Sequence, residues 1–327
     1  MRKKLKDVCM FYSGTGFPIQ YQGQTKGEYP FYKVGDIANN AIAGKIYLEL
    51  CNNYISSDVA KMIKGCILPK DTVVFAKIGE ALKLNRRAIT SCDCLIDNNA
   101  MGIAPKLDSL RIQYFYFCMK NLKMQTLAES TTVPSVRKTV LEKYEIEVPS
   151  LVEQEEIEKK LTLTQKIIEK RRQELSYLDE IIKARFVEMF GDPVKNPKGW
   201  EVVTIGDIVT EVRYGTSKPA VEGGKYPYLR MNNLTADGHL DLNDLKYIDI
   251  PDDEIEKCVV RKGDVLFNRT NSIELVGKTV VFDLQEDMII AGYIIRVRLN
   301  KRLLPEILSQ YMNLEALKDI LRSMAKG

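Results

Sequence analysis

The sequence predicts an α/β (α+β) protein in which two similar mixed domains, the products of a tandem duplication, are joined by one long helix. Three observations lead to this architecture. Short segments recur in one order at a nearly constant spacing, a charged stretch without Gly or Pro lies between the two copies, and each copy contains short strands bounded by turn residues. We expect domains at residues 1–148 and 191–327, with a spacer helix at 149–190.

The two copies match in five short segments. GEYPFYKVGDI resembles GKYPYLRMNNL, and PKDTVVFAKI resembles RKGDVLFNRT. The spacing stays between 192 residues, from Phe75 to Phe267, and 201 residues, from Gly14 to Gly215. Five matches in one order and nearly one register indicate a duplication, because chance similarity would not preserve the order.

Each copy is expected to fold as a compact mixed domain. Runs rich in apolar, β-forming residues at 72–75, 265–267 and 288–297 are bounded by Gly, Asn and Asp and indicate strands. Each copy then closes with a helical segment, at 108–129 in the first and at 304–325 in the second.

The segment between the copies has the features of one long helix. Residues 150–190 contain no Gly or Pro, and charges of both signs alternate along them. Ser150 followed by Glu153 predicts a capping box at the start, and the run FGDPVKNPKGW supplies the stop. At about 1.5 Å per residue, a helix of this length would hold the two domains apart by roughly 60 Å.

Apolar residues on this helix recur at every seventh position, which predicts a coiled-coil seam. The seam is imperfect because the second heptad position that should face a partner is half polar. The residues at this position are Thr164, Arg171, Leu178 and Arg185. An amphipathic helix lying on one domain is the alternative. The residues expected at a helix interface are Leu161, Ile168, Leu175, Leu178, Ile182 and Met189.

Composition narrows the class of protein. At 327 residues with 45% apolar content, the chain is long enough for two packed cores. It has no apolar run of about 18 residues and no signal-peptide pattern, so we expect a soluble, cytoplasmic protein without a membrane partner. Its seven cysteines are scattered without paired spacing, which indicates reduced thiols and no metal site. The net charge of +4 permits a polyanionic partner without requiring one.

Catalytic motifs are weak throughout. The run FYSGTGFP resembles the glycine motif of a methyltransferase cofactor site, but Pro18 and the residues after it forbid the helix that this motif needs. No N-P-P-Y or D-P-P-Y motif for base methylation occurs, and EGGKYP at 222–227 lacks the Ser or Thr and the first Gly of a P-loop. The single histidine, His239, lies in a predicted surface turn. We therefore expect no catalytic residues in this chain.

Several motifs together resemble the specificity subunit of a type I restriction-modification enzyme. They are VPSLVEQEEIEKKL at the start of the long helix, FVEMFGDPVKNPKGWEVVTIGDI at its end, and YGTSKP in the second copy. The resemblance covers essentially the whole chain. Its specificity comes from the combination and order of these motifs, since none of them alone is a catalytic signature.

The resemblance implies a function in DNA recognition. Each domain would be a target-recognition domain that reads one half of a split, asymmetric site on double-stranded DNA. The helical region would act as a spacer and as a docking surface for two methyltransferase subunits, while restriction and motor activities would belong to a third kind of subunit. No cofactor is expected in this chain, because S-adenosylmethionine, ATP and magnesium would be bound by the partner subunits.

The sequence departs from the family in one respect. When the closing helices of the two copies are aligned, Gly327 corresponds to Ser135, so a counterpart of residues 136–190 does not occur in the sequence. The family's second long helix, which packs antiparallel against the first, would thus be missing. We expect the seam of residues 161–189 to be covered by self-association or by methyltransferase subunits.

Polar and basic loops follow the matched residues Phe75 and Phe267. Arg and Lys can pair with guanine edges or phosphates, and Asn can pair with adenine, so these loops carry the chemistry that base readout requires. A solvated hairpin loop is the alternative at both places. The candidate DNA-contacting residues are Lys77, Lys83, Asn85, Arg86 and Arg87 in the first domain and Asn268, Arg269, Asn271 and Lys278 in the second.

The two Gly-Thr loops form a second set of DNA-binding candidates. Their backbone N–H and hydroxyl groups could bind phosphate, or the loops could be tight turns that only position the first strand of each domain. The residues concerned are Tyr12 and Thr15 in the first loop and Tyr214, Thr216, Ser217 and Lys218 in the second.

A non-catalytic adaptor with two protein-binding modules on a helical rod is the alternative function. Salt dependence separates the two, because binding to DNA weakens steeply as salt rises and binding between apolar protein surfaces does not.

Overall fold

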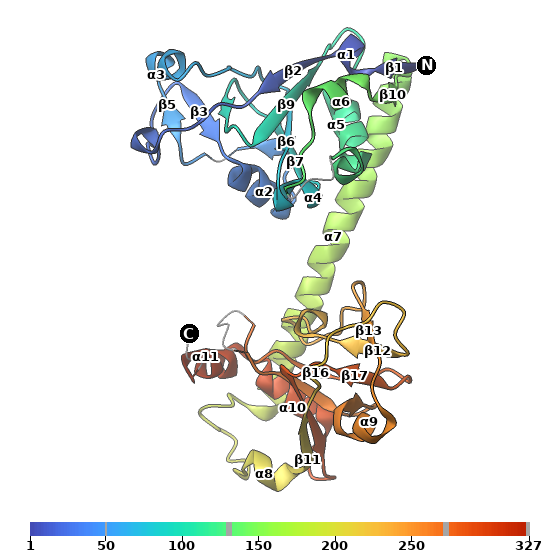
Figure 1. Ribbon diagram of the computed structural model, residues 1–327. Coiled ribbons are helices and arrows are strands. Elements are labelled where there is room, and N and C mark those ends of the chain that lie inside the picture. Colours follow the sequence, from blue (N-terminus) through green and yellow to red (C-terminus); the bar gives the residue numbers. More distant parts are fainter. Residues whose placement is uncertain (50, 129–132, 271–274, 325–327) are drawn as a thin grey trace. The chain divides into compact units, whose positions relative to one another are not determined.

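The protein is described by a computed structural model that covers residues 1–49, 51–128, 133–270 and 275–324 (Figure 1). The chain forms two compact units, Met1–Arg172 and Gln173–Gly327, and the long helix α7 (Leu151–Phe190) contributes to both. The predicted fold class is confirmed, since both units mix helices with strands and one continuous helix occupies the expected position. The units divide within α7, whereas the predicted domain boundaries lie at the ends of this helix.

The first unit is built on a sheet with the strand order β2-β9-β6-β7-β4. A smaller sheet has the order β5-β3-β8, and β1 pairs with β10 at the start of the chain. The strands of the unit are β1 (Arg2–Lys4), β2 (Cys9–Ser13), β3 (Tyr29–Tyr32), β4 (Tyr47–Leu48), β5 (Tyr54–Ile55), β6 (Val73–Ala76), β7 (Arg87–Thr90), β8 (Leu95–Ile96), β9 (Ala100–Pro105) and β10 (Glu145–Glu147). Its helices before α7 are α1 (Leu5–Val8), η1 (Ile19–Tyr21), α2 (Val34–Ile42), α3 (Ser57–Met62), α4 (Glu80–Lys83), α5 (Ile112–Asn121), η2 (Met124–Leu127) and α6 (Lys138–Lys143).

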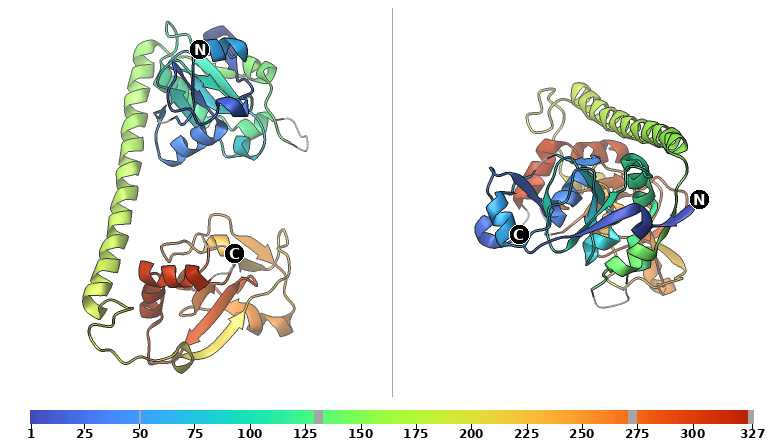
Figure 2. Two further views of the ribbon diagram at one scale, coloured as in Figure 1. Left: turned by 90° about the vertical axis from the view of Figure 1, so that its left-hand side faces the viewer. Right: turned by 90° about the horizontal axis from the view of Figure 1, so that it is seen from above.

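The second unit has a main sheet with the order β11-β18-β15-β16 and a smaller one with the order β13-β12-β17-β14. Its strands are β11 (Val209–Tyr214), β12 (Tyr226–Leu229), β13 (Lys246–Ile248), β14 (Val259–Val260), β15 (Val265–Asn268), β16 (Thr279–Val281), β17 (Met288–Ile290) and β18 (Ile294–Leu299). Its helices after α7 are α8 (Ile205–Ile208), η3 (Met231–Asn233), α9 (Asp252–Cys258), α10 (Pro305–Met312) and α11 (Glu315–Met324). Figure 2 shows α10 and α11, in red, beside the last turns of α7.

The strand order confirms the duplication. The main-sheet order β2-β9-β6-β7 in the first unit is repeated as β11-β18-β15-β16 in the second. In the smaller sheets, β3 lies between antiparallel β5 and parallel β8, just as β12 lies between antiparallel β13 and parallel β17. The predicted strand at 288–297 is two strands, β17 and β18, because a turn at 291–293 sends the chain from the smaller sheet to the main one.

The repeated Gly-Thr pair is explained by a close approach of two backbones. After β2 and after β11 the chain passes directly against the end of the smaller sheet, where Thr15 N–H donates to Ile96 O and Thr216 N–H donates to Ile290 O, both at 2.9 Å. A Cβ atom at Gly14 would overlap the carbonyl oxygen of Asp97, and one at Gly215 would overlap the corresponding carbonyls of the second unit. Glycine is needed at both positions because only glycine leaves room for this contact.

A β-bulge changes the register between the two copies. The pairing of β11 with β18 shifts between Val209 and Glu211, which inserts one residue that β2 does not have. Tyr214 therefore occupies the position of Ser13, and the counterpart of Tyr12 is Arg213. The two tyrosines that precede the Gly-Thr pairs are thus not equivalent, and they point to opposite faces of their strands.

The two main cores differ in size. In the first unit α5 and α6 pack on the main sheet, and Leu5, Phe75, Phe115 and Leu141 are completely buried there. The corresponding core of the second unit is built around Ile208, Val265 and Leu308, with partly exposed neighbours.

The second unit also buries a charge in its main sheet. Arg296 of β18 is fully buried, donates to Glu211 Oε2 at 2.6 Å, and donates to the carbonyl oxygen of Val259. The hydrogen bond from Arg213, with the charges of Arg296 and Arg298, lowers the pKa of the Glu211 carboxyl.

The start of α7 is fixed as the sequence predicted. Ser150 N–H and Oγ donate to Glu153 Oε2 at 2.9 and 2.8 Å, and Glu153 N–H donates back to Ser150 Oγ, which completes the capping box. Gln154 is fully buried and accepts from Arg111 N–H while it donates to the carbonyls of Ser109 and Pro149. These contacts bind the first turn of α7 to the first unit.

Glu158 makes the second attachment of α7. Its carboxylate accepts from Arg111 Nε at 2.7 Å and from Tyr114 N–H at 2.8 Å, in the first turn of α5. A carboxylate at this point satisfies an unpaired N–H group of α5 and interacts favourably with its dipole. Glu153, Gln154 and Glu158 of VPSLVEQEEIEKKL therefore have structural roles where α7 begins beside α5.

The end of α7 is closed by the run FGDPVKNPKGW. Gly191 takes a left-handed conformation with φ of 87°, and its N–H donates to Val187 O. Lys198 Nζ donates to the carbonyls of Glu188 and Met189, and Trp200 Nε1 donates to Phe190 O. The last carbonyl groups of the helix, which would otherwise lack partners, are thus satisfied by side chains of the second unit.

The predicted seam of α7 is exposed. Exposed fractions range from 38% at Leu161 to 63% at Leu175, so neither unit buries this face. The alternative of an amphipathic helix whose apolar face is buried on one domain does not describe the structure. Within the described residues, no helix has the length and apolar character needed to cross a lipid bilayer.

We expect Gly14→Ala to lower the free energy of unfolding by about 1–3 kcal/mol, the range for overpacked sites, because the new methyl group displaces the Asp97 carbonyl. Gly16→Ala is the matched control, since it lies in the same loop and its Cβ would meet nothing within 4 Å. Urea unfolding of both variants measures the difference, and equal midpoints would contradict the close-approach explanation.

Glu158→Ala should destabilise the first unit by on the order of 2 kcal/mol, because it leaves a buried N–H group of α5 without its charged acceptor. Glu156→Ala removes an exposed carboxylate two residues away and serves as the control. Thermal unfolding followed by circular dichroism makes the comparison. If the two variants unfold at the same temperature, Glu158 does not attach α7 to the unit.

Candidate nucleic-acid interface

In each unit three residues lie at the same edge of the main sheet, each next to the end or the start of a strand. In the first unit Ser13 is the last residue of β2, Lys77 follows β6, and Asn99 precedes β9. Lys77 N–H donates to Asn99 O at 2.9 Å, and β9 lies between the other two strands. We call Ser13, Lys77 and Asn99 the strand-end site of the first unit.

The second unit has a strand-end site at the equivalent positions. Tyr214 ends β11, Arg269 follows β15, and Tyr293 precedes β18. Arg269 N–H donates to Tyr293 O at 2.8 Å, which repeats the backbone contact of Lys77 with Asn99. The same fold therefore presents two different sets of side chains at one topological position.

The strand-end site of the second unit is aromatic and basic. The guanidinium carbon of Arg269 lies 5.4 Å from the ring centroid of Tyr214, and Tyr214 and Tyr293 are 54% and 61% exposed. An exposed guanidinium held against an aromatic ring is oriented before any ligand arrives. Arginine can pair bidentately with guanine, and exposed rings can stack on unpaired bases, so the site suits nucleic acid.

The strand-end site of the first unit is smaller and more polar. Ser13 and Asn99 are exposed and Lys77 is half-buried. These side chains offer one cation, one amide and one hydroxyl, which can contact phosphates and base edges but provide no stacking surface. Since the two sites differ in chemistry, they would favour different base sequences.

The Gly-Thr loops form tight turns against the smaller sheets. The backbone N–H groups of Thr15 and Thr216 already bond to the smaller sheets, so they are not free to bind phosphate. Thr216 Oγ1 accepts from Lys218 N–H, and Lys218 Nζ lies 2.8 Å from Glu254 Oε2. Ser217 is exposed between them. Tyr12 is half-buried beside the core of the first unit, and burial raises the pKa of its hydroxyl.

The residues after Lys77 lie beside α5 and α7. Lys83 is exposed and lies 2.6 Å from Glu80. Asn85 takes a left-handed conformation with φ of 54°, and its side-chain oxygen accepts from Met124 N–H. Arg86 lines a cavity of about 430 Å³ together with Lys45, Lys120 and Arg172. Lys83, Asn85 and Arg86 lie on the segment that joins β6 to β7, and Lys77 is not among the residues that line this cavity.

Three of the predicted DNA-contacting residues have structural roles. Arg87 is buried and donates to Asn85 O and Oδ1 and to Leu122 O, and burial lowers its pKa to about 10. Asn268 is fully buried and donates to Leu275 O, and Lys278 Nζ donates to Leu234 O. These contacts leave Arg87 and Asn268 off the surface, so we do not include them in an interface. Asn271 lies outside the described residues.

Sequence reasoning missed Ser13, Asn99 and Tyr293. None of them lies in a conspicuously basic run, and each is recognised only from its place at the end of a strand. The internal repeat could have identified two of these positions. Asn99 and Tyr293 correspond to each other when β9 of the first copy is aligned with β18 of the second.

A cluster of possible metal ligands occurs elsewhere in the second unit. Asp179, Asp237 and His239 have ligand atoms within 4.8 Å of one another, and His239 Nε2 lies 3.8 Å from Asp179 Oδ1. Burial raises the pKa of the Asp237 carboxyl, but the hydrogen bond from Thr235 and the charges of His239 and Lys183 outweigh it and keep the pKa below its usual value. Asp179 lies on α7, so the cluster joins α7 to the turn that carries Asp237 and His239.

The sequence family described as the type I restriction modification DNA specificity domain matches residues 1–177 and 197–326. The chain is 27% identical over 258 residues to the specificity subunit of the type I restriction enzyme MjaIX of Methanocaldococcus jannaschii, covering 71% of this chain and 57% of that protein. It is 26% identical over 220 residues to the specificity subunit of the type I restriction enzyme EcoKI of Escherichia coli, and this match covers 62% of this chain and 47% of that protein. The chain thus spans about half the length of these two relatives.

Among solved structures, the S subunit of the type I restriction-modification system from M. genitalium aligns with 99% of this chain and 79% of its own, at 13% identity and a TM-score of 0.42. The two family matches cover one unit each apart from a gap at the end of α7, in agreement with the repeated strand order. The chain therefore belongs to the family of type I restriction modification DNA specificity domains.

Proposed function

We propose that this chain is the DNA-reading specificity subunit of a type I restriction-modification complex, and that its two units read the two halves of a split, asymmetric site on double-stranded DNA. The observation that carries this proposal is the pair of strand-end sites. They occupy one topological position in two copies of a fold, yet one presents Ser13, Lys77 and Asn99 and the other Tyr214, Arg269 and Tyr293.

A repeated backbone with different side chains at one position fits the reading of a DNA sequence. The backbone fixes where the side chains contact the DNA, and the side chains at that place decide which bases are accepted. Two identical sites would favour a symmetric target. Because one site offers a stacked Arg269 and two aromatic rings and the other a lysine and an amide, the half-sites should differ in sequence.

We further propose that the chain directs other subunits and has no catalytic role of its own. The exposed apolar face of α7 is the surface on which methyltransferase subunits, or a second copy of the chain, would pack. S-adenosylmethionine, ATP and magnesium would be bound by the methyltransferase and by the restriction and motor subunits. The complex would act on DNA in the cytoplasm.

Replacing the cation of one strand-end site should alter recognition of one half-site. We expect Arg269→Ala and Lys77→Ala each to weaken discrimination at its own half by about 1–3 kcal/mol, or roughly fivefold to 150-fold. Lys301→Ala is the control, because it removes one exposed positive charge beyond the opposite end of β18. Binding is measured on DNA with substitutions in either half. An equal loss of discrimination at both half-sites for either variant would contradict the assignment of one half-site to each unit.

Co-expression with the cognate methyltransferase subunit, followed by mapping of methylated bases in the host genome, tests the function as a whole. A split motif with two different halves is the expected result. Methylation at a continuous or palindromic motif would refute the bipartite reading. Binding to a protein ligand that does not weaken with rising salt, with no methylation at all, would favour the adaptor function instead.

A further inference from the structure

The first unit contains a cavity whose walls carry mostly positive charge. It has a volume of about 430 Å³ and lies between the end of α2, the segment before β7, and the helices α5 and α7. Glu169 is the single carboxylate among the described residues that line it. The basic side chains on its walls are Lys45, Arg86, Arg87, Lys120 and Arg172. Five cations against one carboxylate leave the cavity with an excess of positive charge.

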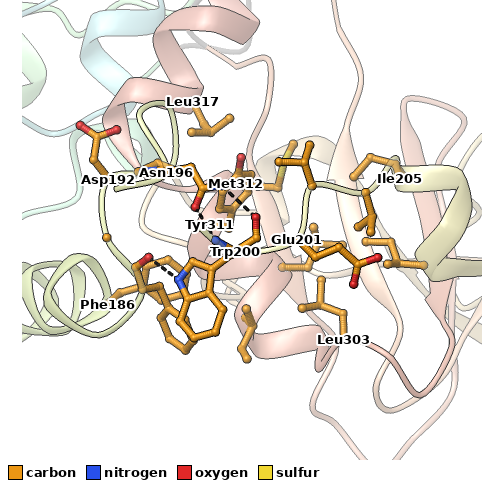
Figure 3. A pocket seen from close by; sticks show the side chains of 18 residues that line it. Phe186, Asp192, Asn196, Trp200, Glu201, Ile205, Leu303, Tyr311, Met312 and Leu317 are labelled. Atoms are coloured by element: carbon orange, nitrogen blue, oxygen red, sulfur yellow. Dashed lines mark hydrogen bonds between the residues drawn. The ribbon is translucent and has the colours of Figure 1, made fainter. Parts of the chain in front are cut away.

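A cavity in the second unit has the opposite character. It has a volume of about 520 Å³ and lies beside the end of α7, where Phe186, Trp200 and Tyr311 are among the side chains that line it (Figure 3). Among the described residues, no Lys or Arg lines it, whereas Asp192 and Glu201 do. An anion would find no cation on these walls, so the concentration of basic groups distinguishes the cavity of the first unit.

Arg87 is the clearest sign that the basic cavity binds an anion. Its side chain is 2% exposed, and it donates only to uncharged acceptors, which are the carbonyl and side-chain oxygens of Asn85 and the carbonyl of Leu122. Its Nε–H group is buried and has no hydrogen-bond partner within the described residues. Buried charges are normally paired with an opposite charge, because taking a charge out of water costs free energy.

The two ionisable groups of opposite type on the cavity wall do not supply this charge. Tyr116 interacts with Arg87, but burial raises the pKa of its hydroxyl, so it is neutral at pH 7. The Glu169 carboxylate lies against Gly44, where a Cβ atom would be 3.3 Å from Oε2, and it is not an acceptor for Arg87. Arg87 therefore carries its charge beside the cavity without a counter-charge.

Three further basic groups are available to a ligand. Arg86, Lys120 and Arg172 form no ion pair within the described residues, whereas Lys45 Nζ lies 2.6 Å from Glu49 Oε2. Lys120 and Arg172 are exposed and Arg86 is half-buried. Several cations around one small space suit a group that has more than one negative charge and several acceptor oxygens, and phosphate has both properties.

We propose that this cavity binds a free phosphorylated small molecule of about the size of a nucleotide. Its phosphate groups lie among Arg86, Lys120 and Arg172 and supply the counter-charge that Arg87 lacks. The volume is in the range of small-molecule pockets, and a DNA duplex is too wide to bring its backbone to a buried guanidinium. The cavity shares no residue with the strand-end site of the same unit, so this inference does not depend on DNA recognition.

Binding of ADP and of inorganic pyrophosphate to the full chain tests the proposal. Isothermal titration calorimetry at low ionic strength should show one site for each. At about 100 times Kd, either ligand should raise the unfolding temperature of the first unit by about 5 °C or more, because it binds only the folded state. Sodium chloride at the same ionic strength is the reference. If ADP and pyrophosphate stabilise the chain no more than this salt does, the proposal is wrong.

Substitutions of both signs assign the binding to the cavity. Arg86→Gln and Lys120→Gln should each weaken pyrophosphate binding about tenfold, the loss expected for one charge-assisted hydrogen bond. Glu169→Gln should tighten binding, because it removes the single negative charge from the walls. Lys143→Gln is the control, since Lys143 is exposed on α6 and does not line the cavity. The same affinity in all four variants would overturn the assignment.

Competition with a short DNA duplex separates a free ligand from a phosphate of the DNA backbone. Pyrophosphate should stay bound when the duplex is present at saturation. If the duplex displaces pyrophosphate, and Lys120→Gln weakens duplex binding as much as it weakens pyrophosphate binding, the cavity holds the DNA backbone and the proposal of a free small molecule is wrong.

Discussion

In each unit the first strand of the main sheet pairs antiparallel with the last one, and this pairing closes the fold. β2 pairs with β9 in the first unit, and β11 pairs with β18 in the second. The last strand, β9 or β18, pairs on its other side with β6 or β15. Because three strands end together at one edge, residues far apart in the sequence are brought into one small site. A repeated backbone can then display unrelated side chains there.

The closure also places the beginning and the end of the first unit side by side. β1 and β10 pair next to the start of α7, so the helix begins beside the N-terminus of its own unit. Gln154 and Glu158 attach its first turns to this unit, and Lys198 and Trp200 cap its last carbonyl groups in the second. Both ends of α7 are therefore held by specific polar contacts, while its apolar face remains exposed between them.

Sequence patterns predicted the features that depend on spacing along the chain. The duplication, the extent of α7 and its capping box at Ser150 and Glu153 all follow from local order or from repeated segments, and the structure contains them. Side-chain direction was harder to predict. A basic residue next to a turn of the sheet can point into solvent, as Arg269 does after β15, or turn inward to bond carbonyl groups, as Arg87 does at the start of β7, and composition is the same in both cases. The inserted residue in β11 likewise made Tyr12 and Tyr214 look equivalent when they are not.

The two buried arginines give the units different responses to acid. Arg87 is held by amide and carbonyl oxygens, which do not titrate, whereas Arg296 depends on the Glu211 carboxylate. Since folding lowers the pKa of Glu211 below its ordinary value of 4.5, its stabilising effect is complete above that value and is lost as the pH falls through the lowered one. Protonation would leave a buried guanidinium without its counter-charge. Acid should thus loosen the sheet of the second unit, while Arg87 of the first unit keeps all its partners.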